Sequence, residues 1–300
     1  MDFADIISPT AFVKDPAGFV RNPVGTGPFK FVKWIKDDRI IVEAFKDYWS
    51  KARGPFLDRV IFRAIPENSV RFLELKAGNI HICQFPNAAD IPMAKKDPKL
   101  QVFTQPGMNI GYLGFNHKKE PWKSNLNLRK AFAHAINRKA IVDNIYQGMG
   151  EVAKNCIPTT MWGYNKEVPG YQYDVDLAKK FLAEAGFPEG KGLPEITLWS
   201  MPVARPYNPE GLKVGVAMIG DLGKIGIKAR VVSYEWGTYL KRQREQPEDM
   251  DLFQLGWTGD NGDPDNFFAV LFDGLASSAV RTQWHNEIYH KLMLDGKQMV

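Results

Sequence analysis

The chain has 300 residues, of which 44% are hydrophobic and 24% are charged, and its formal net charge is +5. This composition is typical of a folded globular protein with one large domain or two domains of ordinary size. The basic residues are spread along the sequence, so nucleic acid is not an expected partner. No apolar run approaches the roughly 20 residues of a membrane span. The first residues lack the basic and apolar regions of a signal peptide, which by itself would indicate a cytoplasmic protein.

The first third of the chain is rich in predicted strands. Alternating apolar residues predict a strand over residues 29–34, and β-branched residues predict two more over 39–45 and 59–65. Short helices are expected at 69–76 and 91–96.

The stretch VFTQPGMNIGYLGFN, residues 102–116, is extended and punctuated by glycine and proline. The pattern changes after it from strands to alternating helices and strands, so a domain boundary is expected here. Its glycines would let the chain cross between two lobes and flex.

The second part of the chain predicts an α/β fold. Apolar spacing indicates one helix over 126–146, which Gly148 ends, and another over 174–185 with Asp174 as its N-cap. An alternation of strands and helices follows, which predicts a largely parallel sheet covered by helices. The expected elements are strands at 195–199, 227–233 and 251–257, helices at 208–224 and 235–245, and a last helix at 286–300.

The acidic stretch GWTGDNGDPDNFF, residues 256–268, raises the question of a metal or catalytic site. A calcium loop starting at Asp260 fails at the third, fifth and twelfth positions, which need oxygen ligands, and at the sixth, which needs glycine. Histidine and cysteine are too distant for a tight metal site, so no metal or cofactor is expected. Carboxylates for glycoside hydrolysis find no support elsewhere in the chain. Neither a phosphate loop nor a nucleophile motif is present. Cys83 and Cys156 are expected as buried thiols rather than as a disulfide.

The position of the acidic stretch relative to the predicted sheet gives a better interpretation of its role. Ligands of open α/β sheets bind outside the carboxyl ends of the strands. The loop after the strand ending at Trp199 carries Arg205 and Tyr207, and the acidic loop follows the strand ending at Trp257. Arginine matches a carboxylate and aspartate matches an ammonium group, so a zwitterion such as an amino acid or a short peptide is a candidate ligand. The pattern leaves open which of one to three aspartates takes part, and solvated turn residues remain the alternative.

Three further motifs are NPVGTGPFKFVKW at 22–34, YLGFNHKKEPW at 112–122 and IPTTMWGYN at 157–165. They resemble the extracytoplasmic solute-binding proteins, family 5, of peptide ABC importers. MPVARPYNP at 201–209, YEWGTYLKR at 234–242 and the acidic stretch narrow the resemblance to the dipeptide-binding members.

The resemblance implies an α/β, two-lobed periplasmic-binding-protein fold, type II-like and of cluster C. Residues 1–106 would form the C-terminal part of lobe I, 107–114 the hinge crossing and 115–300 lobe II. It further implies that the first lobe is incomplete and that lobe II stops before the chain returns to lobe I. It assigns Asp260 to the peptide's α-ammonium and Arg205 to its α-carboxylate. Tyr207 and Trp257 would line the pocket, and Asp263 and Asp265 belong to the loop structure.

The implied function is that of a periplasmic substrate-binding component, not an enzyme, that delivers dipeptides to the permease subunits of an ABC importer. It is expected to be a monomer, and a chemotaxis receptor is a further candidate partner. The alternatives are a binding protein for haem or another peptide-like solute, or a truncated remnant that binds nothing.

Overall fold

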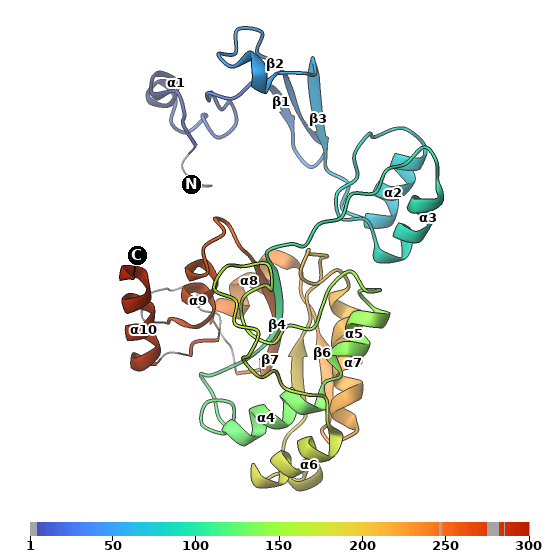
Figure 1. The fold of residues 1–300 in the computed structure, drawn as a ribbon, viewed down its shortest axis with the longest axis vertical. Helices are drawn as coiled ribbons and strands as arrows, with labels where there is room; N and C mark the ends of the chain where they lie inside the picture. The colour runs from blue at the N-terminus through green and yellow to red at the C-terminus, as the bar shows by residue number, and fades with distance from the viewer. Residues whose placement is uncertain (1–4, 246–247, 275–281, 285, 300) are drawn as a thin grey trace. The chain divides into compact units, whose positions relative to one another are not determined.

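The computed structural model describes residues 5–245, 248–274, 282–284 and 286–299 (Figure 1). The chain divides into two compact units, Met1–Pro86 and Asn87–Val300. This division lies earlier in the chain than the lobe boundary expected after residue 106. The hinge crossing at 107–114 stays a prediction.

The first unit contains a three-stranded antiparallel sheet with the strand order β1-β2-β3. Its strands are β1 (Phe29–Ile35), β2 (Arg39–Ala44) and β3 (Arg59–Arg63), which confirms the three strands predicted here. Asp37 turns the chain between β1 and β2 with a left-handed φ of 58°. The unit also has helices α1 (Pro9–Lys14), which the sequence did not predict, and α2 (Asn68–Lys76).

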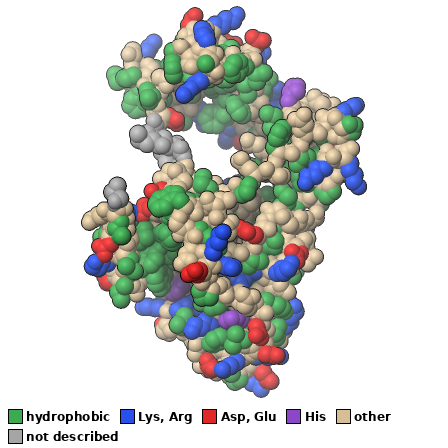
Figure 2. Space-filling model, viewed as in Figure 1, with side chains coloured by type: hydrophobic (Ala, Val, Ile, Leu, Met, Phe, Trp, Pro, Cys, Tyr) green, Lys and Arg blue, Asp and Glu red, His purple; other side chains and the backbone are tan. Residues whose placement is uncertain are grey.

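This unit buries few of its own apolar side chains. Among its described hydrophobic residues only Tyr48 and Phe72 are buried, whereas large side chains such as Trp49 (73% exposed) and Phe56 (80% exposed) reach the surface. Figure 2 shows hydrophobic side chains gathered on the surface of the unit. Burial of apolar surface is the main stabilising contribution to folding. The described part of this unit therefore forms only a small hydrophobic core of its own.

The second unit is built on a four-stranded sheet with the order β4-β7-β5-β6. Strands β5 (Ile196–Trp199), β6 (Ala229–Val232) and β7 (Leu252–Thr258) are parallel, as the sequence predicted. Strand β4 (Asn109–Phe115) pairs antiparallel with β7 at the edge. These three strands run in the same direction, so the loops after β5 and β7 leave from the same edge of the sheet, although β7 continues to Thr258 beyond the Phe253 that pairs with the last residue of β5.

Both faces of this sheet are covered by helices, as expected for parallel strands. Ile196 and Leu198 enter a core with α4 (Leu126–Ala135), α6 (Val175–Glu184) and α7 (Gly211–Gly223). On the other face, residues of β5 and β7 pack against α8 (Trp236–Glu245). The remaining helices of four residues or more are α3 (Ile91–Lys96), α5 (Arg138–Asn144), α9 (Asp265–Phe272) and α10 (Glu287–Gln298).

The single helix predicted over 126–146 is wrong, because the chain breaks between α4 and α5. Ile136 adopts extended backbone angles, and the Asn137 side chain then caps α5 by accepting a hydrogen bond from the Ala140 backbone amide (3.0 Å). The backbone amide of Asn137 donates a hydrogen bond to Asp221 Oδ2 (2.8 Å). Both helices bury their apolar residues in one core, so the helical spacing continues across the break and conceals it.

The start predicted for α7 is also wrong. The helix begins at Gly211 rather than at Pro209, and Glu210 instead of Asn208 occupies the N-cap position. Asn208 is buried, and its Nδ2 donates to Gln254 Oε1 on β7 (2.9 Å) instead of capping a helix. The tertiary hydrogen bond therefore prevails over the local capping preference.

The two cysteines are free and half-buried rather than fully buried thiols. Burial raises the pKa of the Cys156 thiol to about 12. The thiol is therefore protonated near neutral pH and is a poor nucleophile.

Candidate functional site

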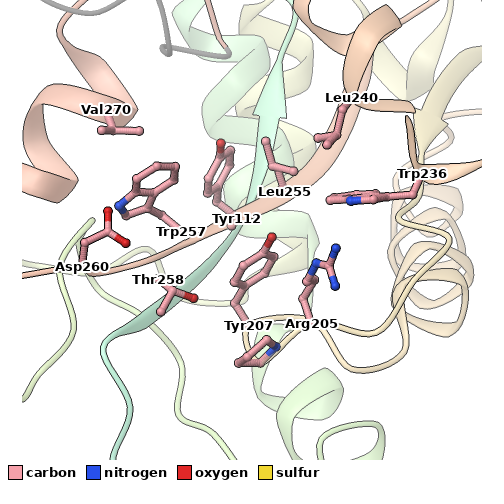
Figure 3. A pocket seen from close by; sticks show the side chains of 12 residues that line it. Tyr112, Arg205, Tyr207, Trp236, Leu240, Leu255, Trp257, Thr258, Asp260 and Val270 are labelled. Atoms are coloured by element: carbon pink, nitrogen blue, oxygen red, sulfur yellow. The ribbon is translucent and has the colours of Figure 1, made fainter. Parts of the chain in front are cut away.

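A cavity of about 320 Å³ lies at the carboxyl edge of the second unit's sheet (Figure 3). Its walls come from β4, β7, the loop after β5, and helices α8 and α9. The lining is mostly aromatic and aliphatic. These residues are Tyr112, Tyr207, Trp236, Leu240, Leu255, Trp257 and Val270.

All four residues predicted for the site line this cavity: Arg205, Tyr207, Trp257 and Asp260. Arg205 and Asp260 are the only charged side chains among its described lining residues. Figure 3 shows Asp260 beside Trp257 and Arg205 beside Tyr207, toward different ends of the cavity. The structure thus brings one cation and one anion to the same largely apolar space.

Arg205 is held by its own loop and by an aromatic ring. Its backbone exchanges two hydrogen bonds with the backbone of Asn208 (3.0 and 2.9 Å), and the Asn208 side chain anchors the loop to Gln254. The guanidinium carbon lies 4.8 Å from the centroid of the Trp236 ring, which is a cation–π contact. The charge is therefore positioned rather than free to move through solvent.

Tyr207 packs over two paired glycines. Gly111 of β4 and Gly256 of β7 are directly opposite each other in the sheet, and a Cβ atom on either would collide with Tyr207. The Tyr146 hydroxyl donates to the Tyr207 carbonyl oxygen (2.9 Å). Burial raises the pKa of the Tyr207 phenol, and the neighbouring Arg205 opposes part of this shift. The phenol therefore keeps its proton at neutral pH and can donate a hydrogen bond to a ligand.

Asp260 and Trp257 share one partner on α9. Oδ1 of Asn266 accepts hydrogen bonds from Trp257 Nε1 (2.7 Å) and from the Asp260 backbone amide (3.1 Å). Nδ2 of Asn266 donates to Asp260 Oδ2 (3.3 Å). The anionic end of the cavity is therefore tied to the first turn of α9.

The other two aspartates of the acidic stretch do not line the cavity. Asp263 Oδ1 accepts a hydrogen bond from the Asp265 backbone amide (2.9 Å), which is a turn role, as predicted. The assignment of Asp265 to the loop is wrong, because this residue begins α9, and its carboxylate pairs with Lys297 (3.1 Å).

The sequence did not identify Tyr112, Trp236, Leu240, Leu255 or Val270 as lining residues. Trp236 follows the end of β6, so the rule that ligands bind beyond strand ends would have found it. The others lie within strands or helices, where apolar residues look like ordinary core.

The described residues contain no group of three or more histidine, cysteine or acidic residues that could hold a metal ion. None of the helices in the described part of the chain combines the length and the apolar character needed to cross a membrane.

The second unit is an α/β fold with a largely apolar cavity at the carboxyl edge of its sheet, and one cationic and one anionic side chain line that cavity. The family described as bacterial extracellular solute-binding proteins, family 5 Middle, matches residues 3–278. The chain therefore belongs to this family, which confirms the resemblance found in the sequence.

The relatives include proteins named for peptides and for haem. The dipeptide-binding protein of Escherichia coli is 43% identical over 282 residues, covering 92% of this chain and 51% of that protein. Heme-binding protein A of Haemophilus influenzae is 43% identical over 256 residues, covering 85% of this chain and 45% of that protein. The chain spans about half the length of the curated relatives it matches.

Similar solved structures also come from periplasmic and dipeptide-binding proteins. A periplasmic binding protein from Helicobacter pylori in complex with the peptide STSA gives a TM-score of 0.83 at 33% identity, over 98% of this chain and 56% of that one. A dipeptide-binding protein from Pseudoalteromonas in complex with Met-Leu gives 0.83 at 31% identity, over 96% and 57%. The predicted α/β, two-lobed periplasmic-binding-protein fold class is confirmed.

Proposed function

We propose that the chain belongs to the substrate-binding component of an ABC importer that captures dipeptides by their two charged ends. One observation carries this proposal: Arg205 and Asp260 line a single cavity, and the other described residues that line it are uncharged. The Arg205 guanidinium matches the peptide α-carboxylate, and the Asp260 carboxylate matches the α-ammonium group. Relatives named for dipeptide binding support it.

The aromatic walls would complete the capture. Tyr207 can donate a hydrogen bond beside Arg205, and the Trp257 indole offers a flat apolar surface beside Asp260. Charge-assisted hydrogen bonds contribute about 1.5–3 kcal/mol each, so two ion contacts and some apolar burial are enough for micromolar binding, about −8 kcal/mol.

The proposal places the protein in the periplasm as a monomer and as a binding protein rather than an enzyme. The permease subunits of the importer would receive the dipeptide, and a chemotaxis receptor is a second partner to test. One of the matched structures is a periplasmic binding protein associated with an ABC transporter, which supports the compartment and the importer.

Calorimetry of the full-length protein with a panel of dipeptides tests the proposal. Arg205→Ala and Asp260→Asn should each weaken dipeptide binding at least tenfold, because each leaves one peptide charge without its partner. N-acetylation of a dipeptide should reduce its affinity for the wild type, whereas Asp260→Asn should bind the acetylated and the free dipeptide equally well. Binding of dipeptides by both variants at wild-type strength would show that the two charges do not hold the ligand.

Haem is the second candidate ligand, because a relative with 43% identity is named for haem binding. An absorbance titration with hemin distinguishes the two. A saturable Soret shift that dipeptides suppress would show that both ligands bind in the cavity. The lack of a shift would leave the dipeptide as the remaining candidate ligand.

A further inference from the structure

Asn266 occupies an unusual position at the anionic end of the cavity. It is the second residue of α9, six residues beyond Asp260 and nine beyond Trp257, and its side chain contacts both. One oxygen accepts two hydrogen bonds, of 2.7 Å from the indole and 3.1 Å from the Asp260 backbone amide. Its nitrogen donates one hydrogen bond of 3.3 Å to the Asp260 carboxylate.

These partners fix the orientation of the amide. An indole N–H and a backbone N–H can only donate, so the Asn266 oxygen must face both of them. The amide nitrogen is then directed at the carboxylate, which in its ionised form accepts hydrogen bonds but cannot donate them. An aspartate at this position would lack the donor, and a leucine of similar size would lack both functions.

We propose that Asn266 is a positioning residue for ligand capture, holding the Asp260 carboxylate and the Trp257 indole where they receive the ammonium end of the ligand. The inference rests on the proposed function and names a residue through which the anionic end is preorganised. A binding group held by hydrogen bonds from a second layer of residues loses less freedom when the ligand arrives.

The first experiment measures binding of a free dipeptide and its N-acetylated form by calorimetry. Asn266→Ala should weaken binding of the free dipeptide about tenfold, because Asp260 is no longer held, and should change binding of the N-acetylated form less than twofold. The control is Asn261→Ala in the same stretch, an exposed asparagine whose side chain accepts one turn hydrogen bond (3.1 Å) from Asp263. It should leave both affinities unchanged.

A double-mutant cycle asks whether Asn266 acts through Asp260. In an Asp260→Asn background, Asn266→Ala should cost no further affinity for the free dipeptide. A full tenfold additional loss there, or an equal loss for free and acetylated dipeptides, would overturn the proposal, because both indicate a general structural role.

A second measurement needs no ligand. In protein labelled with ¹⁵N-tryptophan, the Trp257 indole N–H resonance, assigned with Trp257→Phe, should shift upfield and exchange faster in Asn266→Ala but not in Asn261→Ala. An unmoved resonance would overturn the inference. If the wild type binds no dipeptide, the proposed function fails and the ammonium role of Asn266 falls with it, whereas a moved resonance would still establish the hydrogen bond.

Discussion

Gly256→Ala offers a direct test of how the cavity is built. Gly256 lies in β7 opposite Gly111, and Tyr207 packs on it. A Cβ atom added here would collide with the Tyr207 ring on one side and would lie 2.5 Å from the backbone oxygen of Ile110 on the other. The tyrosine ring can rotate away, but the oxygen belongs to the neighbouring strand and cannot move without disturbing the sheet.

The expected cost follows from that geometry. Forcing one extra carbon into a well-packed site costs about 1–3 kcal/mol, and we expect a value near the upper end because a backbone atom is involved. For a unit of this size each kcal/mol lowers Tm by about 2–4 °C, so a cost of about 3 kcal/mol should make Gly256→Ala melt about 6–12 °C below the wild type. Displaced Tyr207 should also weaken dipeptide binding.

Thermal unfolding followed by circular dichroism measures the first effect, and calorimetry measures the second. Gly220→Ala is the matched control, because Gly220 lies inside α7 with nothing within 4 Å of an added Cβ. That variant should be more stable by up to about 1 kcal/mol, since alanine favours the helix. A Gly256→Ala protein that melts and binds like the wild type would refute the packing argument.

Three further predictions concern the second unit. Asp251 is buried, accepts hydrogen bonds from an indole and a backbone amide, and pairs with a lysine ammonium. Asp251→Ala should therefore lower the free energy of unfolding, measured with urea, by about 3 kcal/mol. Tyr146→Phe leaves the Tyr207 carbonyl without its donor and should cost about 1 kcal/mol in the same assay. In a Cys83→Ala background, Cys156 should react slowly with Ellman's reagent at pH 8. Its rate should rise as pH approaches its raised pKa of about 12, because only the thiolate reacts. Fast labelling in the folded protein at pH 8 would contradict the last prediction.

The elements of the sheet could be predicted from the sequence because their cause is local. Alternating or β-branched runs predicted β1, β2, β5 and β7, and no end of these strands differs from the expected end by more than one residue. The break before α5 depends instead on a capping asparagine that reads as an ordinary polar residue in a helical pattern.

The candidate site divides in the same way. Arg205 and Asp260 were predictable because both follow strands of one parallel sheet, and topology brings such loops together. The glycine pair was not predictable, because its two members lie on different strands and are distant in sequence. Asn266 was not predictable either, although its partners are close in sequence, because its role depends on the direction of its side chain. No periodicity encodes a side chain that turns back from a helix onto the preceding loop.

Strand β7 explains why the two halves of the cavity stay in register. Gln254 and Gly256 are two residues apart, so they lie on the same face of the strand. Gln254 anchors the loop of Arg205 through Asn208, and Gly256 supports Tyr207 on that loop. Asp260 follows the end of the same strand. A slip of β7 by one residue would turn both supports to the opposite face. One strand therefore positions both charges, and their separation is a property of the second unit's sheet.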